Sequence, residues 1–222
     1  MIRTLLFLSC LAASWLLPVS ALAADTQEFD YRRMYELLYQ FETLPPPARD
    51  RLRFAIRLQD ETGRAPPGME VHIRYGRREI PVTVDEFGLL DLPFSPQLAS
   101  INAPVVTNQP ADSLRLGFTM VIRRPENRPI DIEWLLAGMQ QADAAMQARA
   151  RIAENLVPEV IGVTLKFAGE TRGQVIIHGE TDDVEYRADE YNTVDIPIDE
   201  ANLPERIEIT DQPLVIFPLF QG

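Results

Sequence analysis

The chain has 222 residues, 46% of them hydrophobic, and a formal net charge of −12. An acidic chain disfavours nucleic acid and anionic lipid as partners, because both are bound through a basic face. The only cysteine, Cys10, lies near the N-terminus, so no disulfide is expected in the remainder, and apolar cores must stabilise the fold.

The N-terminal segment has the features of an export signal. Arg3 is followed by an apolar stretch at 4–17, and residues 21–23 (Ala-Leu-Ala) fit the small-x-small pattern of a cleavage site. The apolar stretch is shorter than the roughly 20 residues that span a bilayer. We therefore expect residues 1–23 to be a cleaved signal peptide of a bacterial periplasmic or secreted protein, with no transmembrane segment in the mature chain.

The first half of the remaining chain predicts one helix followed by strands. Residues 30–43 place apolar side chains at three- and four-residue steps, with Asp30 as N-cap, and prolines at 45–47 end this helix. Residues 94–103 have no periodic pattern and are expected to be irregular. Alternating apolar and polar residues predict strands at 52–58, 71–75, 80–84, 89–92, 104–106 and 114–122.

The second half predicts the same succession of elements. After a polar linker at 123–129, Asp131 caps a long helix that reaches to about Leu156 and ends before Pro158. Further strands are expected at 161–167, 175–178, 184–188, 193–197, 206–209 and 214–217.

Two short motifs recur about 100 residues apart. Residues 85–93 (DEFGLLDLP) match residues 189–197 (DEYNTVDIP), and residues 107–110 (TNQP) match residues 210–213 (TDQP). A period of this length indicates a duplicated domain, since solenoid repeats are shorter. The sequence therefore predicts an α+β, β-rich fold of two tandem similar lobes. Each lobe is expected to be a small antiparallel β-sandwich with an associated N-terminal helix, at 24–128 and 129–222.

The repeated Asp-Glu motif favours a structural turn. Gly88 and Asn192 occupy the same position and are the residue types that most readily adopt positive φ. Asp85 and Asp189 can accept hydrogen bonds from amides of the turn. The alternative is a calcium site, because calcium prefers carboxylate oxygens near a turn, although neither copy has the full loop of alternating ligands. The candidate metal ligands are Asp85, Glu86, Asp91, Asp189, Glu190 and Asp195.

No other pattern predicts a catalytic residue or a further cofactor. His72 and His178 are the only histidines, and they are out of register between the two copies, which favours structural roles. No nucleophile elbow, phosphate loop or dinucleotide fingerprint is present. Lys166 is the only lysine beside many arginines. This bias fits a GC-rich genome, or alternatively a set of planar guanidinium contacts to carboxylate or phosphate.

Two local resemblances accompany these motifs. Residues 82–93 resemble a turn of transthyretin-like and carboxypeptidase-regulatory-like sandwiches. Residues 89–93 and 102–110 resemble an exported proteobacterial family of unknown function, the DUF2987 type. The second resemblance implies periplasmic residence and supplies no catalytic residues.

Three functions are compatible with these features. The first is a non-enzymatic exported binding or interaction module, an envelope accessory protein whose partner is a protein or an envelope component. The second is a hydrolase that uses acidic residues in a cleft between the lobes. The third is a calcium-stabilised, adhesin-like module. Unpaired strand edges would also support a homodimer.

Overall fold

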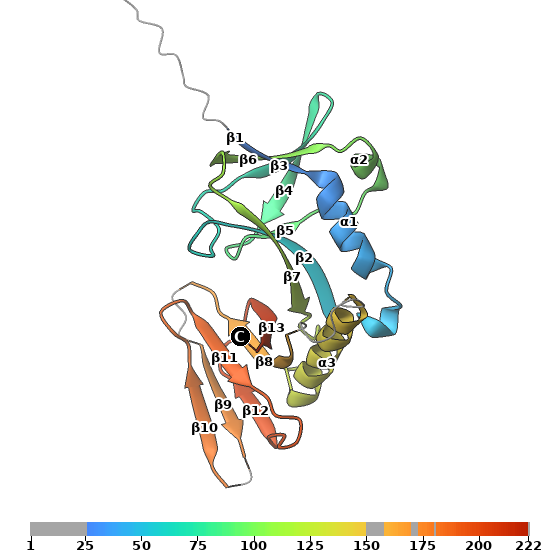
Figure 1. Cartoon of the computed structure of the whole chain (residues 1–222). Coiled ribbons are helices and arrows are strands. Elements are labelled where there is room, and N and C mark those ends of the chain that lie inside the picture. The colour runs from blue at the N-terminus through green and yellow to red at the C-terminus, as the bar shows by residue number, and fades with distance from the viewer. Residues whose placement is uncertain (1–25, 150–157, 170–172, 180, 222) are drawn as a thin grey trace, which may run out of the picture.

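The computed structural model describes residues 26–149, 158–169, 173–179 and 181–221. The expected signal peptide and the expected end of the long helix, at 150–156, lie outside these residues. The described chain is β-rich with few helices, and its sheets are antiparallel. Figure 1 shows an N-terminal half, up to about residue 122, above a C-terminal half that begins near residue 132.

One curled sheet forms the N-terminal half. Its elements are β1 (Thr26–Asp30), α1 (Tyr31–Glu42), the 3-10 helix η1 (Pro46–Ala48), β2 (Leu52–Gln59), β3 (Val71–Tyr75), β4 (Arg78–Val84), β5 (Leu89–Asp91), α2 (Pro96–Ser100), β6 (Pro104–Pro110) and β7 (Arg115–Ile122). The seven strands lie in the order β1-β6-β3-β4-β5-β2-β7. The sheet curls into a half-barrel (Figure 1), where the sequence analysis expected two stacked sheets.

The helix α1 packs its apolar stripe on the curled sheet, as the sequence periodicity predicted. The buried residues of this stripe, which share one cluster with side chains of β2, β3, β6 and β7, are Tyr31, Met34, Leu38 and Phe41. Asp30 is the N-cap residue, but its side chain makes no cap hydrogen bond. Instead, Asn102 Oδ1 accepts a hydrogen bond from the Arg32 amide at 3.0 Å, and Asn102 Nδ2 donates to Asp30 Oδ1 at 3.0 Å. The residue that caps α1 therefore comes from the segment after α2.

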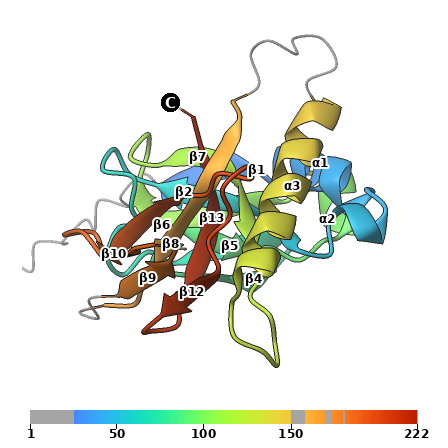
Figure 2. The same cartoon turned by 90° about the horizontal axis from the view of Figure 1, so that it is seen from below.

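In its described residues, the C-terminal half has one helix and two three-stranded sheets. Its elements are α3 (Ile132–Arg149), β8 (Val160–Lys166), β9 (Gln174–His178), β10 (Asp183–Arg187), β11 (Thr193–Pro197), β12 (Arg206–Ile209) and β13 (Val215–Phe220). The sheets have the strand orders β10-β9-β12 and β11-β8-β13. Asp131 caps α3 as predicted, since its Oδ1 accepts a hydrogen bond from the Trp134 amide at 2.7 Å. Seen from below, α3 runs alongside the strands of this half (Figure 2).

The two halves share their strand order. In the first half, β6-β3-β4 continues directly into β5-β2-β7. In the second half, β12-β9-β10 has the order of β6-β3-β4, and β11-β8-β13 has the order of β5-β2-β7. The strands β10 and β11 approach each other without forming the ladder that joins β4 to β5. The strand β1, which covers the outer edge of β6, has no counterpart beside β12 among the strands described.

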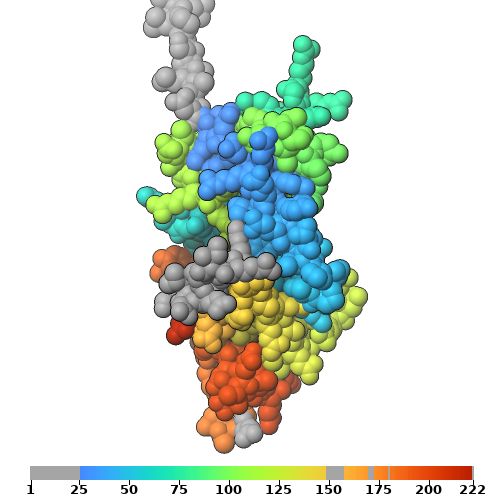
Figure 3. All heavy atoms as spheres, turned by 45° about the vertical axis from the view of Figure 1, so that its right-hand side comes forward, coloured from blue at the N-terminus to red at the C-terminus, as the bar shows by residue number. Residues whose placement is uncertain are grey.

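The halves meet through buried apolar surface. A cluster of Ala55, Leu89, Val121, Val215 and Phe217, flanked by Phe87, joins the outer face of the first sheet to β13. The helix α3 closes the junction from another side, and a Cβ atom on its Gly138 would come within 2.7 Å of Ile122 Cγ2. In Figure 3 this helix, in yellow, lies between the blue N-terminal half and the orange C-terminal half. The largest core cluster also includes residues from both halves.

The strand pattern was predicted well, and three short elements were not expected. These are β1, the 3-10 helix η1 and the five-residue helix α2. The helix α2 lies within residues 94–103, which were expected to be irregular, and its first turn is capped by Ser95 through the Leu98 amide. Within the described residues, the search for helices of sufficient length and hydropathy to span a membrane finds none.

Candidate functional site

The two Asp-Glu turns have the same hydrogen-bond network. Asp85 Oδ1 accepts the amides of residues 87 and 89, each at 2.9 Å, and Asp189 Oδ1 accepts the amides of residues 191 and 193, each at 2.8 Å. Gly88 and Asn192 have φ values of 77° and 54°. The prediction that both motifs are turns with a positive φ at this position is therefore confirmed.

Each turn is also fixed to the neighbouring strand. The Leu58 amide donates to the Gly88 carbonyl at 2.9 Å, and the Phe167 amide donates to the Asn192 carbonyl at 2.9 Å. A Cβ atom on Gly88 would overlap the Leu58 carbonyl oxygen, so glycine is needed there for space as well as for conformation. Asn192 fits in the second turn, where its side-chain amide donates to the Gly169 carbonyl.

The six carboxylates suggested as calcium ligands do not form a metal cluster. Asp85 and Asp189 each use Oδ1 for two backbone amides, and Asp195 Oδ1 accepts a hydrogen bond from Thr164 Oγ1 at 2.6 Å. Glu86, Asp91 and Glu190 are exposed. Among the residues that the structure describes, no group of three or more Asp, Glu, His or Cys side chains is arranged to hold a metal ion. Calcium binding stays a prediction.

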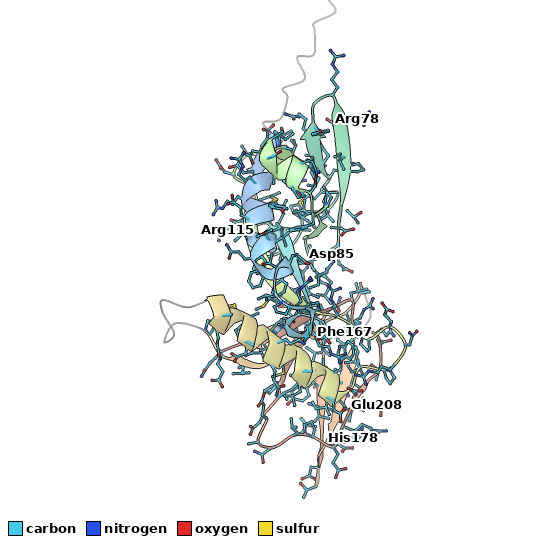
Figure 4. The ribbon with its side chains drawn as sticks, turned by 90° about the vertical axis from the view of Figure 1, so that its right-hand side faces the viewer. Arg78, Asp85, Arg115, Phe167, His178 and Glu208 are labelled. Carbon is cyan, nitrogen blue, oxygen red and sulfur yellow. The ribbon has the colours of Figure 1, made fainter. Side chains whose placement is uncertain are left out.

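A small pocket lies between the two turns. It has a volume of about 230 Å³ and receives residues from both halves. Its walls are formed by Arg57, Gly63, Arg64, Glu86, Phe87, Lys166, Phe167, Gly169, Tyr191 and Asn192. Figure 4 shows Asp85 and Phe167 near the junction of the halves, whereas Arg78 points away at the far end of the N-terminal half.

Three cationic side chains converge on this pocket, which we call the interlobe pocket. Arg57 donates from Nε to the Phe87 carbonyl at 2.8 Å and from Nη2 to the Gly63 carbonyl at 2.6 Å. Lys166 Nζ donates to Thr193 Oγ1 at 3.1 Å and lies 5.6 Å from the centre of the Phe87 ring. The Arg64 guanidinium lies 4.8 Å from the centre of the Tyr191 ring.

Burial lowers the pKa of two of these cations. Burial lowers the pKa of Arg57, and the nearby Asp85 partly opposes this shift. Burial also lowers the pKa of Lys166, and repulsion from Arg57 lowers it further. Within the described part of the chain, no salt bridge joins Arg57, Arg64 or Lys166 to a carboxylate.

A second, larger concavity lies beside β12. This β12 cleft has a volume of about 1270 Å³ and is bounded on one side by β12 and residues 211–214, and on the other by residues 121–131. Several of its charged side chains are paired, such as Arg206 with Glu208 at 3.2 Å and Arg128 with Asp131 at 3.5 Å. The cleft thus combines a strand edge with a mixed polar and apolar lining.

The segment opposite β12 is held by an aromatic anchor. The Trp134 indole Nε1 donates to the Arg123 carbonyl at 2.6 Å. The guanidinium groups of Arg51 and Arg128 lie 3.6 and 4.7 Å from the Trp134 ring centre. These contacts hold the linker against α3.

The two histidines lie in separate strands and contact carboxylates. His72 Nε2 lies 3.4 Å from Glu79 in the N-terminal half, and His178 lies 3.0 Å from Asp183 and 3.6 Å from Glu208 in the C-terminal half. Figure 4 places His178 and Glu208 together on the C-terminal half, away from Asp85. The histidines are therefore not brought together in one site.

Sequence reasoning missed both concavities. The lone lysine was the one available signal for the interlobe pocket. The β12 cleft could not be predicted because β1, the strand that covers the corresponding edge of β6, was not expected. Comparisons with protein-family models, with curated proteins and with solved structures find no match for this chain. Its function therefore has to be argued from these two sites.

Proposed function

We propose that this chain is an exported, periplasmic, non-enzymatic interaction module that binds an extended segment of a protein partner along the edge of β12. The observation that carries the proposal is the edge of β12 opposite β9, which no strand of the described residues covers and which opens onto the β12 cleft. The export signal expected at 1–23 supports the location.

The proposal rests first on the equivalence of the two halves as copies of one unit. The shared strand order and the matching turn networks support this duplication. A further pair of bonds supports it. The Glu70 amide donates to Asn108 Oδ1 at 3.0 Å, and the Gln174 amide donates to Thr210 Oγ1 at 3.1 Å. On this basis β12 corresponds to β6, and residues 108 and 210 are equivalent.

The proposal rests second on the strand β1, which covers the edge of β6 in the first half. In the first half β1 pairs antiparallel with β6, with Phe29 opposite Val105. We aligned the pairing of β12 with β9 to the pairing of β6 with β3. In this alignment Ile207 and Ile209 of β12 take the positions of Val105 and Thr107 of β6. Because bonding alternates along an antiparallel strand, these residues direct their N–H and C=O groups away from β9. Such unpaired groups are a template for another strand.

The linker before α3 does not take the place of β1 in the second half. It precedes α3 as β1 precedes α1, but residues 123–131 lie across the β12 cleft and form no strand. The Trp134 anchor holds the linker there. The cleft is therefore located where a strand equivalent to β1 would lie.

The bound segment can be described from its counterpart. We expect about five extended residues antiparallel to β12, with an apolar side chain opposite Ile207, as Phe29 lies opposite Val105. Main-chain hydrogen bonds would supply affinity and the alternate side chains would supply specificity, as in other cases of strand addition. A second copy of this chain could provide such a segment and would produce a homodimer.

The hydrolase alternative has less support. Acid–base hydrolysis by two carboxylates needs both at a defined separation around the reacting bond. Among the described residues, the interlobe pocket instead receives three cations and one carboxylate, that of Glu86. In the β12 cleft, Glu208 and Asp131 are engaged with arginines.

The test is to block the edge of β12. Ile209→Pro removes an N–H that faces the cleft and leaves the bonds of Thr210 to β9 in place. We expect this variant to lose at least about tenfold in capture of an envelope protein that the wild type retains, since several main-chain bonds depend on a free edge. Hydrogen exchange should show the amides of Ile207 and Ile209 slowed in the captured complex.

The matched control is Glu185→Pro, which blocks the outer edge of β10 in the same sheet. Circular dichroism must first show that both variants are folded. Equal capture by wild type and Ile209→Pro, or fast exchange at Ile207 and Ile209 in the complex, would contradict the proposal. Light scattering of the purified chain distinguishes a homodimer from a complex with another protein.

A further inference from the structure

We infer that the interlobe pocket binds a small oxyanion, a carboxylate or a phosphate, between the two halves of the chain. This site is independent of the strand edge, since its described lining residues include none of those that line the β12 cleft. It is formed by residues that the two turns bring together, with Arg57 and Arg64 from the first half and Lys166 from the second.

The charge balance of the pocket is the first reason. The chain has a net charge of −12, yet three of its cations converge on a pocket in which Glu86 is the only carboxylate among the described lining residues. Like charges that are partly buried repel each other, and this repulsion is relieved by a bound anion. Asp85 attracts Arg57 and Asp189 attracts Lys166, but among the described residues neither carboxylate forms a salt bridge with a cation of the pocket.

The orientation of the donors is the second reason. Arg57 is held by two backbone carbonyls through Nε and Nη2, which fixes the plane of its guanidinium and leaves Nη1 for a ligand. Lys166 uses one donor for Thr193 Oγ1 and retains two. A pre-oriented guanidinium beside an ammonium suits a carboxylate or phosphate group.

The origin of the pair is the third reason. Arg57 lies opposite Leu89, and Lys166 lies opposite Thr193, and these partners are the first residues after the two turns. The two cations therefore occupy corresponding positions in the two halves. A ligand held by both would connect the halves across their junction.

The volume of the pocket limits the size of the ligand that it can hold. A volume of about 230 Å³ is several times the roughly 30 Å³ that a water molecule occupies in the liquid. The rings of Phe87 and Tyr191 form its apolar walls. These dimensions suit inorganic phosphate or a carboxylate with a few carbon atoms.

The experiment is titration calorimetry of the purified chain with inorganic phosphate and, separately, with succinate, at constant ionic strength set by sodium chloride. We expect saturable binding of at least one of the two, which also identifies the preferred group. Lys166→Met should weaken binding roughly tenfold or more, since a hydrogen bond to a charged group is lost. Lys166→Arg should retain binding.

Two further variants make the outcome decisive. Arg78→Met removes an exposed cation at the far end of the N-terminal half and should bind as the wild type does (Figure 4). Arg64→Met removes the exposed cation of the pocket without altering a buried residue, so its loss of affinity cannot come from unfolding. Absence of saturable binding by the wild type, or wild-type affinity in both Lys166→Met and Arg64→Met, overturns the inference. Either result leaves the strand-edge proposal untouched.

Discussion

Replacing Gly88 with alanine is expected to destabilise the protein by more than about 2 kcal/mol. The residue has a φ of 77°, a region that costs an L-residue roughly 1–2 kcal/mol. The new methyl group would also overlap the Leu58 carbonyl oxygen, which belongs to backbone and cannot move aside without disturbing β2. Urea denaturation followed by circular dichroism measures the change in the free energy of unfolding.

Gly76→Ala is the matched control for this prediction. Gly76 also has a positive φ, of 61°, but an added Cβ would meet nothing within 4 Å. Its cost should therefore be limited to the conformational part, about 1 kcal/mol. Equal losses in the two variants would show that the close approach to Leu58 contributes nothing.

Truncating Phe217 to alanine is expected to cost about 3 kcal/mol. Its side chain is only 8% exposed and belongs to the apolar cluster that joins β13 to the first sheet. Large-to-small changes of buried aromatic residues cost about 3–5 kcal/mol, and a site at the edge of the core falls at the lower end. We expect one cooperative transition in urea, because the largest core cluster includes residues from both halves.

Phe94→Ala supplies the comparison. Phe94 is 45% exposed and stacks on Tyr35 with ring centres 4.6 Å apart. Its loss should cost less than about 1.5 kcal/mol, in the range of an aromatic pair. Two separate transitions in the Phe217→Ala variant, or a loss no larger than that of Phe94→Ala, would mean that the junction does not couple the halves.

Elements with strong local patterns were predictable from sequence, and elements that depend on distant partners were not. The alternation in β2 and β12 follows from the face that each strand packs into the largest core cluster, so both strands were placed within a residue. In contrast, β1 has a single apolar residue, Phe29, and exists because its backbone pairs with β6. The helix α2 has a local signal, because Ser95 followed by Pro96 is a favoured combination of N-cap and first-turn residues.

The repeat itself illustrates the limits of matching letters. The sequence comparison aligned Thr107 with Thr210, whereas the hydrogen bonds align Asn108 with Thr210. What the two positions share is a side-chain oxygen that accepts a backbone amide, and Asn and Thr supply it equally well. The identity of the residues was therefore a weaker guide than their bonding role.

The interlobe pocket could not be predicted, because it depends on how the two turns face each other. Lys166 was noticed as the lone lysine, but its alternating pattern indicated only a strand. Arg57 lies in another strand more than 100 residues away, and Arg64 lies in a loop. Only the apolar contact between the halves brings the three cations together.

The anchor of the linker gives the molecule an optical reporter. The chain contains two tryptophans, and one of them, Trp15, lies in the segment expected to be cleaved. If the mature chain is excited at wavelengths that tyrosine does not absorb, its fluorescence would then come from Trp134 alone. Since this indole lies against Arg51 and is bonded to the Arg123 carbonyl, its spectrum responds to any displacement of the linker. Binding of a segment in the β12 cleft can thus be followed by fluorescence without attaching a dye.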